Sequence, residues 1–199
     1  MKTTKHILFY LMVLLSTGLI SCFKDDDVLQ SIIVSGLELH AGFITNGERI
    51  SWVSPAAPDL EVSLADFGLE VEITEWEDDG ADINGANTFL SVNTIVEFSI
   101  TSDSIVMVTQ DSIFLPGEDL SALFMTDRIE RVTGFFGQSR FEPRFSVDYM
   151  IGKSLRIDPM IFQLVAPLER DLNQTFFVAI TMNDGDEYFL QSNGVRVIR

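Results

Sequence analysis

From about residue 30 onward, apolar and polar residues alternate with a period of two in short runs separated by turn residues. Because successive side chains of a strand point to opposite faces, this pattern predicts half-buried strands of an antiparallel fold. The predicted strands cover residues 33–40, 48–53, 60–64, 69–76, 89–100, 113–115, 145–151, 155–157, 176–182, 188–190 and 195–197.

Three segments depart from simple alternation. Residues 104–109 are apolar on both parities, which favours a strand in the centre of a sheet. Three apolar residues between 120 and 124 fall at helical spacing behind Asp119, a suitable cap, so a helix reaching residue 132 is expected. Residues 159–168 are compatible with either a helix or a strand.

Turn signals at residues 45–48, 183–186 and 192–194 separate the strands as successive hairpins would. Hairpins at spacings of about 8–12 residues favour a β-sandwich. We therefore expect a mainly β fold, an immunoglobulin-like antiparallel β-sandwich with one or two short helices, as a single domain over residues 31–199.

The first 21 residues differ from the rest. Lys2 and Lys5 precede an apolar run over residues 7–20, and Ser21 follows, which is the order of a secretory signal peptide. As a helix, this run of 14 residues would span roughly 21 Å, less than the roughly 30 Å of a bilayer's hydrocarbon core. A retained membrane span is therefore not expected.

Cys22, the only cysteine of the chain, comes directly after Leu19-Ile20-Ser21. This sequence resembles the lipobox of bacterial lipoproteins. The resemblance implies cleavage before Cys22, lipidation of its sulfur and acylation of its amine, and two or more acyl chains make a stable anchor. The alternatives are a short N-terminal membrane helix or a fortuitous cysteine after an ordinary signal peptide.

Residues 22–30 form a short tether that contains Lys24, Asp25, Asp26 and Asp27. This motif resembles the export signal with which Bacteroidetes-type bacteria place lipoproteins on the outer surface of the outer membrane. The resemblance implies a lipid-anchored outer-membrane protein that faces the cell exterior. The alternative is a solvated acidic tether without a sorting role.

Charge narrows the range of partners. Without Lys2 and Lys5, the remaining 178 residues hold 11 basic and 30 acidic side chains, a net charge of −19. Such a chain repels phosphate backbones, which excludes nucleic acid as a partner and docking on anionic lipid by charge. Cations, neutral ligands and proteins stay open, and the acidic excess by itself also promotes solubility.

The chain offers few groups for catalysis. Once His6 leaves with the leader, His40 is the only histidine, and it falls on the outward parity beside Glu38. No cysteine nucleophile, Gly-x-Ser-x-Gly elbow or glycine-rich phosphate loop is present. We therefore expect a protein that is not an enzyme, although a hydrolase built on a carboxylate pair stays an alternative.

An acidic loop over residues 77–85 invites comparison with a calcium site. The EF-hand pattern fails at both of its charged ends, but Asp78, Asp79 and Asp82 could still supply oxygen ligands. The alternative is a solvated loop. No cofactor is expected apart from this candidate calcium ion.

Aromatic residues give the remaining candidates, since sugar rings stack on half-wet aromatic side chains. Trp76 lies on the polar parity of its strand beside the acidic loop and is the first candidate. Tyr188 is the second. Trp52 is the third, although it shares a parity with Ile50, which favours the core.

Together these features predict a membrane-anchored, non-enzymatic surface lipoprotein that binds an extracellular ligand, a glycan in the first instance. The first alternative is a structural or accessory subunit of an outer-membrane or fimbria-like assembly, with an outer-membrane protein as partner. The second is a small carboxylate-dependent hydrolase.

Overall fold

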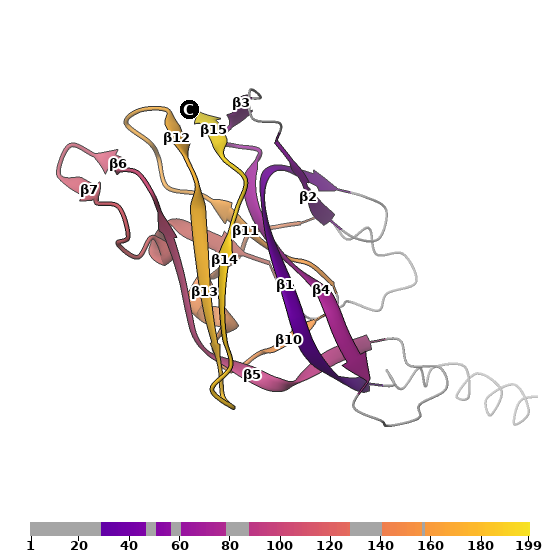
Figure 1. Ribbon diagram of the computed structural model, residues 1–199. Helices are drawn as coiled ribbons and strands as arrows, with labels where there is room; N and C mark the ends of the chain where they lie inside the picture. Colours follow the sequence, from indigo (N-terminus) through magenta and orange to yellow (C-terminus); the bar gives the residue numbers. More distant parts are fainter. Residues whose placement is uncertain (1–28, 47–50, 57–60, 79–87, 128–140, 157) are drawn as a thin grey trace, which may run out of the picture.

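The computed structural model describes residues 29–46, 51–56, 61–78, 88–127, 141–156 and 158–199 (Figure 1). The predicted mainly β fold is confirmed, and the short helices among the described residues are two 3-10 turns, η2 (Ser121–Leu123) and η3 (Val147–Met150). The strands are β1 (Leu29–Asn46), β2 (Ser51–Pro55), β3 (Glu61–Ser63), β4 (Phe67–Asp78), β5 (Thr88–Ser102), β6 (Val106–Thr109), β7 (Ser112–Phe114), β8 (Phe124–Thr126), β9 (Phe145–Ser146), β10 (Ser154–Arg156), β11 (Met160–Leu164), β12 (Leu172–Gln174), β13 (Phe176–Met182), β14 (Glu187–Gln191) and β15 (Val195–Ile198).

The main sheet follows the order β14-β13-β5-β1-β4-β11-β8-β9, with β10 paired to β5 and β2 paired to β1. β5 joins its two halves. Residues 88–91 of β5 pair in parallel with β1, whereas residues 95–102 pair antiparallel with β13. The sheet therefore folds over on itself along β5, and its two halves enclose the core.

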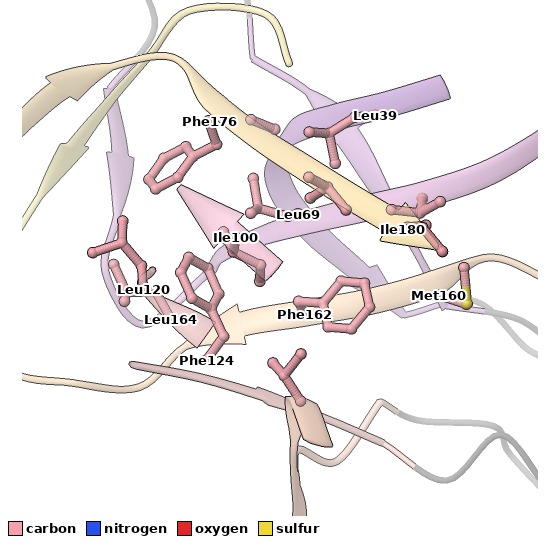
Figure 2. Packing of buried hydrophobic residues seen from close by; sticks show 14 of the residues in the cluster. Leu39, Leu69, Ile100, Leu120, Phe124, Met160, Phe162, Leu164, Phe176 and Ile180 are labelled. Carbon is pink, nitrogen blue, oxygen red and sulfur yellow. The ribbon is translucent and has the colours of Figure 1, made fainter. Parts of the chain in front are cut away.

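The core lies between these halves and is built largely of aromatic and branched side chains. The ring of Phe176 from β13 lies 5.4 Å from that of Phe67 on β4 and 5.9 Å from that of Phe124 on β8. Phe98 from β5 meets Phe162 from β11 at 5.0 Å. Figure 2 shows the labelled side chains pointing toward one another between β13 and β11. Contacts of this kind hold the two halves of the sandwich together.

A small second sheet, in the order β12-β15-β3, covers one end. The turn at residues 192–194 was predicted to start another hairpin, but β15 pairs with β12 and, in parallel, with β3 rather than with β14. The reason is the tight anchoring of the turn: the side-chain amide of Asn193 donates to the carbonyls of Ala41 and Ala56, which directs the chain away from β14.

The predicted helix over residues 119–132 is wrong where the structure describes it. The Asp119 carboxylate accepts hydrogen bonds from the backbone N–H and the hydroxyl of Ser121, but the N-cap of the turn is Leu120, which makes no side-chain cap hydrogen bond. The turn is only η2, however, and the chain then extends so that Phe124 pairs with Leu164 of β11. Strand pairing thus outweighs the local helical spacing.

Two strand predictions also need correction. Residues 145–151 form the two-residue β9 followed by η3, because Val147 and Met150 are buried three positions apart, the period of a 3-10 turn. Residues 104–109 are not central: β6 pairs with β7 in a separate two-stranded sheet. The undecided segment 159–168 contains the buried strand β11.

A register irregularity changes the face of one predicted residue. β1 pairs with β4 along most of its length, with shifts between Val34 and Gly36 and between Gly36 and Leu37. Uninterrupted alternation over residues 33–40 would put Ile33 on the same face as Leu39, but only Leu39 is buried. Because one extra residue at a bulge reverses the alternation, Ile33 faces solvent.

No helix in the described part of the chain is long and apolar enough to cross a membrane.

Candidate ligand-binding face

The most exposed large apolar side chain among the described residues belongs to Phe189, on β14, with 77% of its surface accessible. Its neighbours Tyr188 and Leu190 pack against the core. Alternation along β14 therefore forces Phe189 outward.

Strand register shows what surrounds Phe189. Ala179 of β13 is its cross-strand partner and is paired in turn with Ser99 of β5. Directly paired residues lie on the same face of a sheet, so small side chains flank the ring. We call this surface the Phe189 face; it comprises Ser99, Thr101, Phe177, Ala179, Thr181 and Phe189.

The strands beneath this face are held firmly. Alternate residues of β13 from Phe176 to Met182 are buried in the core. The turn after β13 is fixed to β5, since the backbone N–H of Asn183 donates to the carbonyl of Thr94 at 2.9 Å and the Asn183 side chain accepts from the Thr94 N–H at 3.1 Å. Gly185 closes the turn with a φ of 96°, a conformation that favours glycine. The face is thus a rigid platform.

Charge is confined to one end of the face. Thr181 is paired with Glu187 on one side and with Glu97 on the other, and both carboxylates are exposed. Elsewhere this side of the sheet carries hydroxyl, methyl and aromatic groups, together with the amide of Gln191, which is paired with Phe177. Such a surface suits a neutral ligand with an apolar side and hydroxyl groups, and it repels anions at its charged end.

Sequence reasoning did not single out Phe189, although a signal was present. The turn at residues 183–186 and the inward row of β13 together determine the hairpin register, which pairs Ile180 with Tyr188. That register places Phe189 on the outer face.

Trp76, the first predicted candidate, lies near the end of β4 and is 41% exposed. It is paired with Val34 of β1, just beyond the bulge, and exposed carboxylates of Glu75 and Glu77 flank it in sequence. The ring therefore belongs to a strongly acidic strand end, whereas Phe189 is flanked by Ala179 and Ser99 and has carboxylates at only one end of its face.

Tyr188 has a structural contact in this fold. Its hydroxyl donates to the carbonyl of Val34 at 2.9 Å, where the β1–β4 register shifts. Burial raises the pKa of the Tyr188 phenol, and the carboxylates of Asp186 and Asp184 raise it further. Tyr188 thus connects β14, at one edge of the main sheet, to β1. Tyr188 and Trp76 both contact β1 at Val34.

Trp52 was expected to favour the core, and this is wrong: it is 41% exposed. β2 pairs with the far end of β1, where Trp52 lies opposite Thr45, and it is the neighbouring Val53 that is buried. Thr45 lies eleven positions after Val34 along β1, roughly 36 Å at about 3.3 Å per residue of extended strand. Trp52 therefore shares no site with Trp76 and Tyr188.

The other predicted residues belong to the N-terminal tether and the acidic loop. Cys22, Lys24, Asp25, Asp26, Asp27, Asp79 and Asp82 fall outside the described residues. Asp78 ends β4, opposite Ile32. Within the described ranges, no group of three or more His, Cys, Asp or Glu side chains could hold a metal ion.

A histidine–glutamate cluster occupies the outer face of β1 and β4. The Nε2 atom of His40 lies 3.6 Å from a carboxylate oxygen of Glu38 and 3.7 Å from one of Glu72. Glu70 is paired with His40 and shares the polar parity of β4 with Glu72 and Trp76, but only 4% of it is exposed. The β1–β2 hairpin covers it, and the backbone N–H of Val53 donates to its carboxylate at 2.5 Å.

Burial is the main cause that raises the pKa of the Glu70 carboxyl; Glu72 adds to it, whereas Val53 and His40 oppose it. Gly68 makes this cover feasible, because a Cβ there would come within 2.6 Å of the Ile44 side chain. The partnered Glu70 carboxylate thus serves the packing of the hairpin.

Comparison with known proteins gives only slight similarities. No protein-family model matches the chain, and no curated protein matches it. Among solved structures, the chain is similar to the C-terminal domain of the antigen I/II-family protein AspA of Streptococcus pyogenes, with 14% identity over 83% of this chain and 47% of that chain and a TM-score of 0.25.

It is also similar to the C-terminal domain of the AgI/II polypeptide BspA of Streptococcus agalactiae, with 12% identity over 81% of this chain and 50% of that chain and a TM-score of 0.23. The chain spans about half the length of these structures. Similarity this slight carries no argument about ligand or role.

Proposed function

We propose that this protein is a lipid-anchored, non-enzymatic surface protein that binds a neutral glycan through the Phe189 face. The observation that carries the proposal is the 77% exposure of Phe189 on a rigid sheet surface whose charged groups are confined to one end. Leaving a phenyl ring in water forgoes on the order of 2 kcal/mol of burial free energy, so a ligand that covers it gains that contribution.

The chemistry of the face fits a sugar better than a charged ligand. A pyranose ring has one side of C–H groups, which stack on an aromatic ring, and a rim of hydroxyl groups, which exchange hydrogen bonds with side chains such as Ser99 and Thr101. The net charge of −19 outside the leader disfavours anionic polysaccharides.

The anchor in this proposal rests on the lipobox-like sequence that ends at Cys22 and on the acidic residues Asp25, Asp26 and Asp27 after it. Acyl chains on Cys22 would hold the domain at the outer membrane with its face toward the exterior. The tether is short, so the domain would lie close to the membrane.

A glycan array probed with the purified full chain tests the binding role. We expect binding to neutral glycans and at least a tenfold loss of affinity for Phe189→Ala, which corresponds to about 1.4 kcal/mol. Trp76→Ala is the matched control, since it removes an exposed ring elsewhere and should leave the affinity unchanged.

Silence across neutral glycans, or equal binding by Phe189→Ala, would reject the proposed face. If Trp76→Ala abolishes binding instead, the glycan role survives and the site moves to the end of β4. Addition of a calcium chelator distinguishes a metal-dependent site, because binding at the Phe189 face needs no cation.

A further inference from the structure

The β6–β7 hairpin stands apart from the two larger sheets. Figure 1 shows it at the end of the molecule opposite the first residues of β1. In the part of the chain that the structure describes, β6 and β7 pair only with each other. An isolated two-stranded hairpin has little stability of its own, so its attachment to the core matters.

Both faces of the hairpin are apolar. On the inner face, Val106 is buried and Phe114 packs against the core. On the outer side, Ile105, Ile113 and Leu115 are 40%, 47% and 53% exposed. An apolar row of this kind, concentrated on one small element, is typical of an interaction surface.

The two edges of the hairpin differ. The carbonyl of Met107 on β6 accepts a hydrogen bond from the backbone N–H of Glu169 at 2.9 Å, so the chain after β11 lies along that edge. β7 has no second strand beside it among the described residues. Edge strands left open in this way readily pair with another chain.

Charged residues border the open edge at both ends. Asp111 directly precedes β7, and Glu118, which follows it closely, accepts a hydrogen bond from the backbone N–H of Leu115 at 2.7 Å. Both carboxylates are exposed, whereas Ser112, Ile113 and Phe114 between them are uncharged. The edge thus presents an apolar centre between two negative ends.

We propose that β7 accepts an extended segment of another protein as an added strand, with alternating apolar side chains that cover Ile113 and Leu115 and basic residues that face Asp111 and Glu118. Strand addition supplies backbone hydrogen bonds, and the side-chain row and end charges select the partner. A second copy of this chain is disfavoured, because pairing of two β7 strands brings carboxylates together.

Synthetic peptides test this directly on the full chain. The probe is a nine-residue peptide in which valine alternates with threonine between flanking lysines, and its counterpart carries glutamates in place of the lysines. Fluorescence anisotropy should show at least tenfold tighter binding of the lysine-flanked peptide. The difference should shrink in 1 M NaCl, where the Debye length falls to about 3 Å.

Backbone pairing has its own readout. Two further peptides are N-methylated at every second residue, one at the odd and one at the even positions, so that each lacks the N–H donors of one edge. The peptide methylated on the edge that faces β7 should not bind, and the other should still bind. Equal effects of the two methylation patterns would contradict strand addition.

Ile113→Lys should weaken peptide binding at least tenfold, whereas Ile33→Lys, at an exposed position on β1, should not. Thermal unfolding of both variants shows whether they fold. Absence of peptide binding, or binding that Ile113→Lys leaves unchanged, overturns the proposal, as does concentration-dependent dimerisation of the chain that Ile113→Lys abolishes.

Discussion

The β13–β14 and β6–β7 hairpins of this protein have the same strand geometry but differ in how well their apolar side chains are covered. β13 and β14 extend the main sheet beside β5, with one apolar row buried and one face open to solvent. β6 and β7 pair only with each other among the described residues and carry apolar side chains on both faces. The first hairpin buries its inner apolar row within this chain and exposes the single ring of Phe189, whereas the second exposes a row of three apolar side chains, Ile105, Ile113 and Leu115.

This difference shows how a strand's sequence pattern relates to its partners. Strict alternation identifies a strand with one buried face, and β13 behaves accordingly. A run that is apolar on both parities requires cover on both faces. Where the chain itself provides only one cover, the pattern indicates a partner molecule.

The largest expected effect concerns the inner face of β13. Phe176→Ala removes the ring that contacts both Phe67 and Phe124. We expect a loss of about 3–5 kcal/mol in the free energy of unfolding, because the cavity opens between the two halves of the sandwich. Urea unfolding followed by tryptophan fluorescence measures it. A loss below 1 kcal/mol would mean that the packing of the two halves against each other does not depend on the Phe176 ring.

Within the β6–β7 hairpin, the two faces should differ in how much they contribute to the free energy of unfolding. Val106→Ala deletes a buried side chain and should cost on the order of 2 kcal/mol, whereas Ile113→Ala changes an exposed one and should stay within about 0.5 kcal/mol. Thermal unfolding of the two variants makes the comparison. Equal losses of unfolding free energy in the two variants would show that Ile113 is packed in solution. It would then not be available to a partner.

Tyr188→Phe should cost about 0.5–1.5 kcal/mol, since it removes the hydrogen bond to the Val34 carbonyl. Burial raises the pKa of this phenol, so the folded state favours its neutral form. The stabilisation is therefore present below the ordinary tyrosine pKa and is lost as the pH rises through the folded value.

Unfolding midpoints measured from pH 8 to 11 should accordingly fall less steeply for Tyr188→Phe than for the unaltered chain. Parallel curves would contradict a structural role for the hydroxyl.

The smallest expected effect is at Phe189. Phe189→Ser should change the free energy of unfolding by less than about 0.5 kcal/mol, because the ring makes little contact with the core. Thermal unfolding is the measurement. A loss above 2 kcal/mol would mean that the ring is packed, which would also remove the basis for ligand binding there.

Much of the fold could be read from local patterns. The alternation over residues 176–182 and the turn after it correctly predicted β13, β14 and their pairing. The pairing of β1 with β2 followed in the same way from the turn at residues 45–48. In both cases the interacting residues are close in sequence, so the pattern and the contact coincide.

The candidate site was predicted less well. Trp52, Trp76 and Tyr188 were singled out by residue type, yet Trp52 lies at the opposite end of β1 and Tyr188 has a structural hydrogen bond. Glu70 lies on the polar parity of β4, yet the β1–β2 hairpin folds over β4 and buries it. These outcomes depend on bulges and on segments distant in sequence that pack over a strand. Local periodicity carries no information about either.

The amino-acid sequence by itself determined the mainly β class, the two hairpins with strong turn signals and the inward row of β13. Only the tertiary structure decided that β5 turns between the two halves of the sheet, that β15 pairs away from β14 and that the β6–β7 hairpin has one exposed apolar face. The physical reason is that alternation records how many faces of a strand avoid water, whereas the neighbour that covers each face comes from distant parts of the chain, or from another molecule.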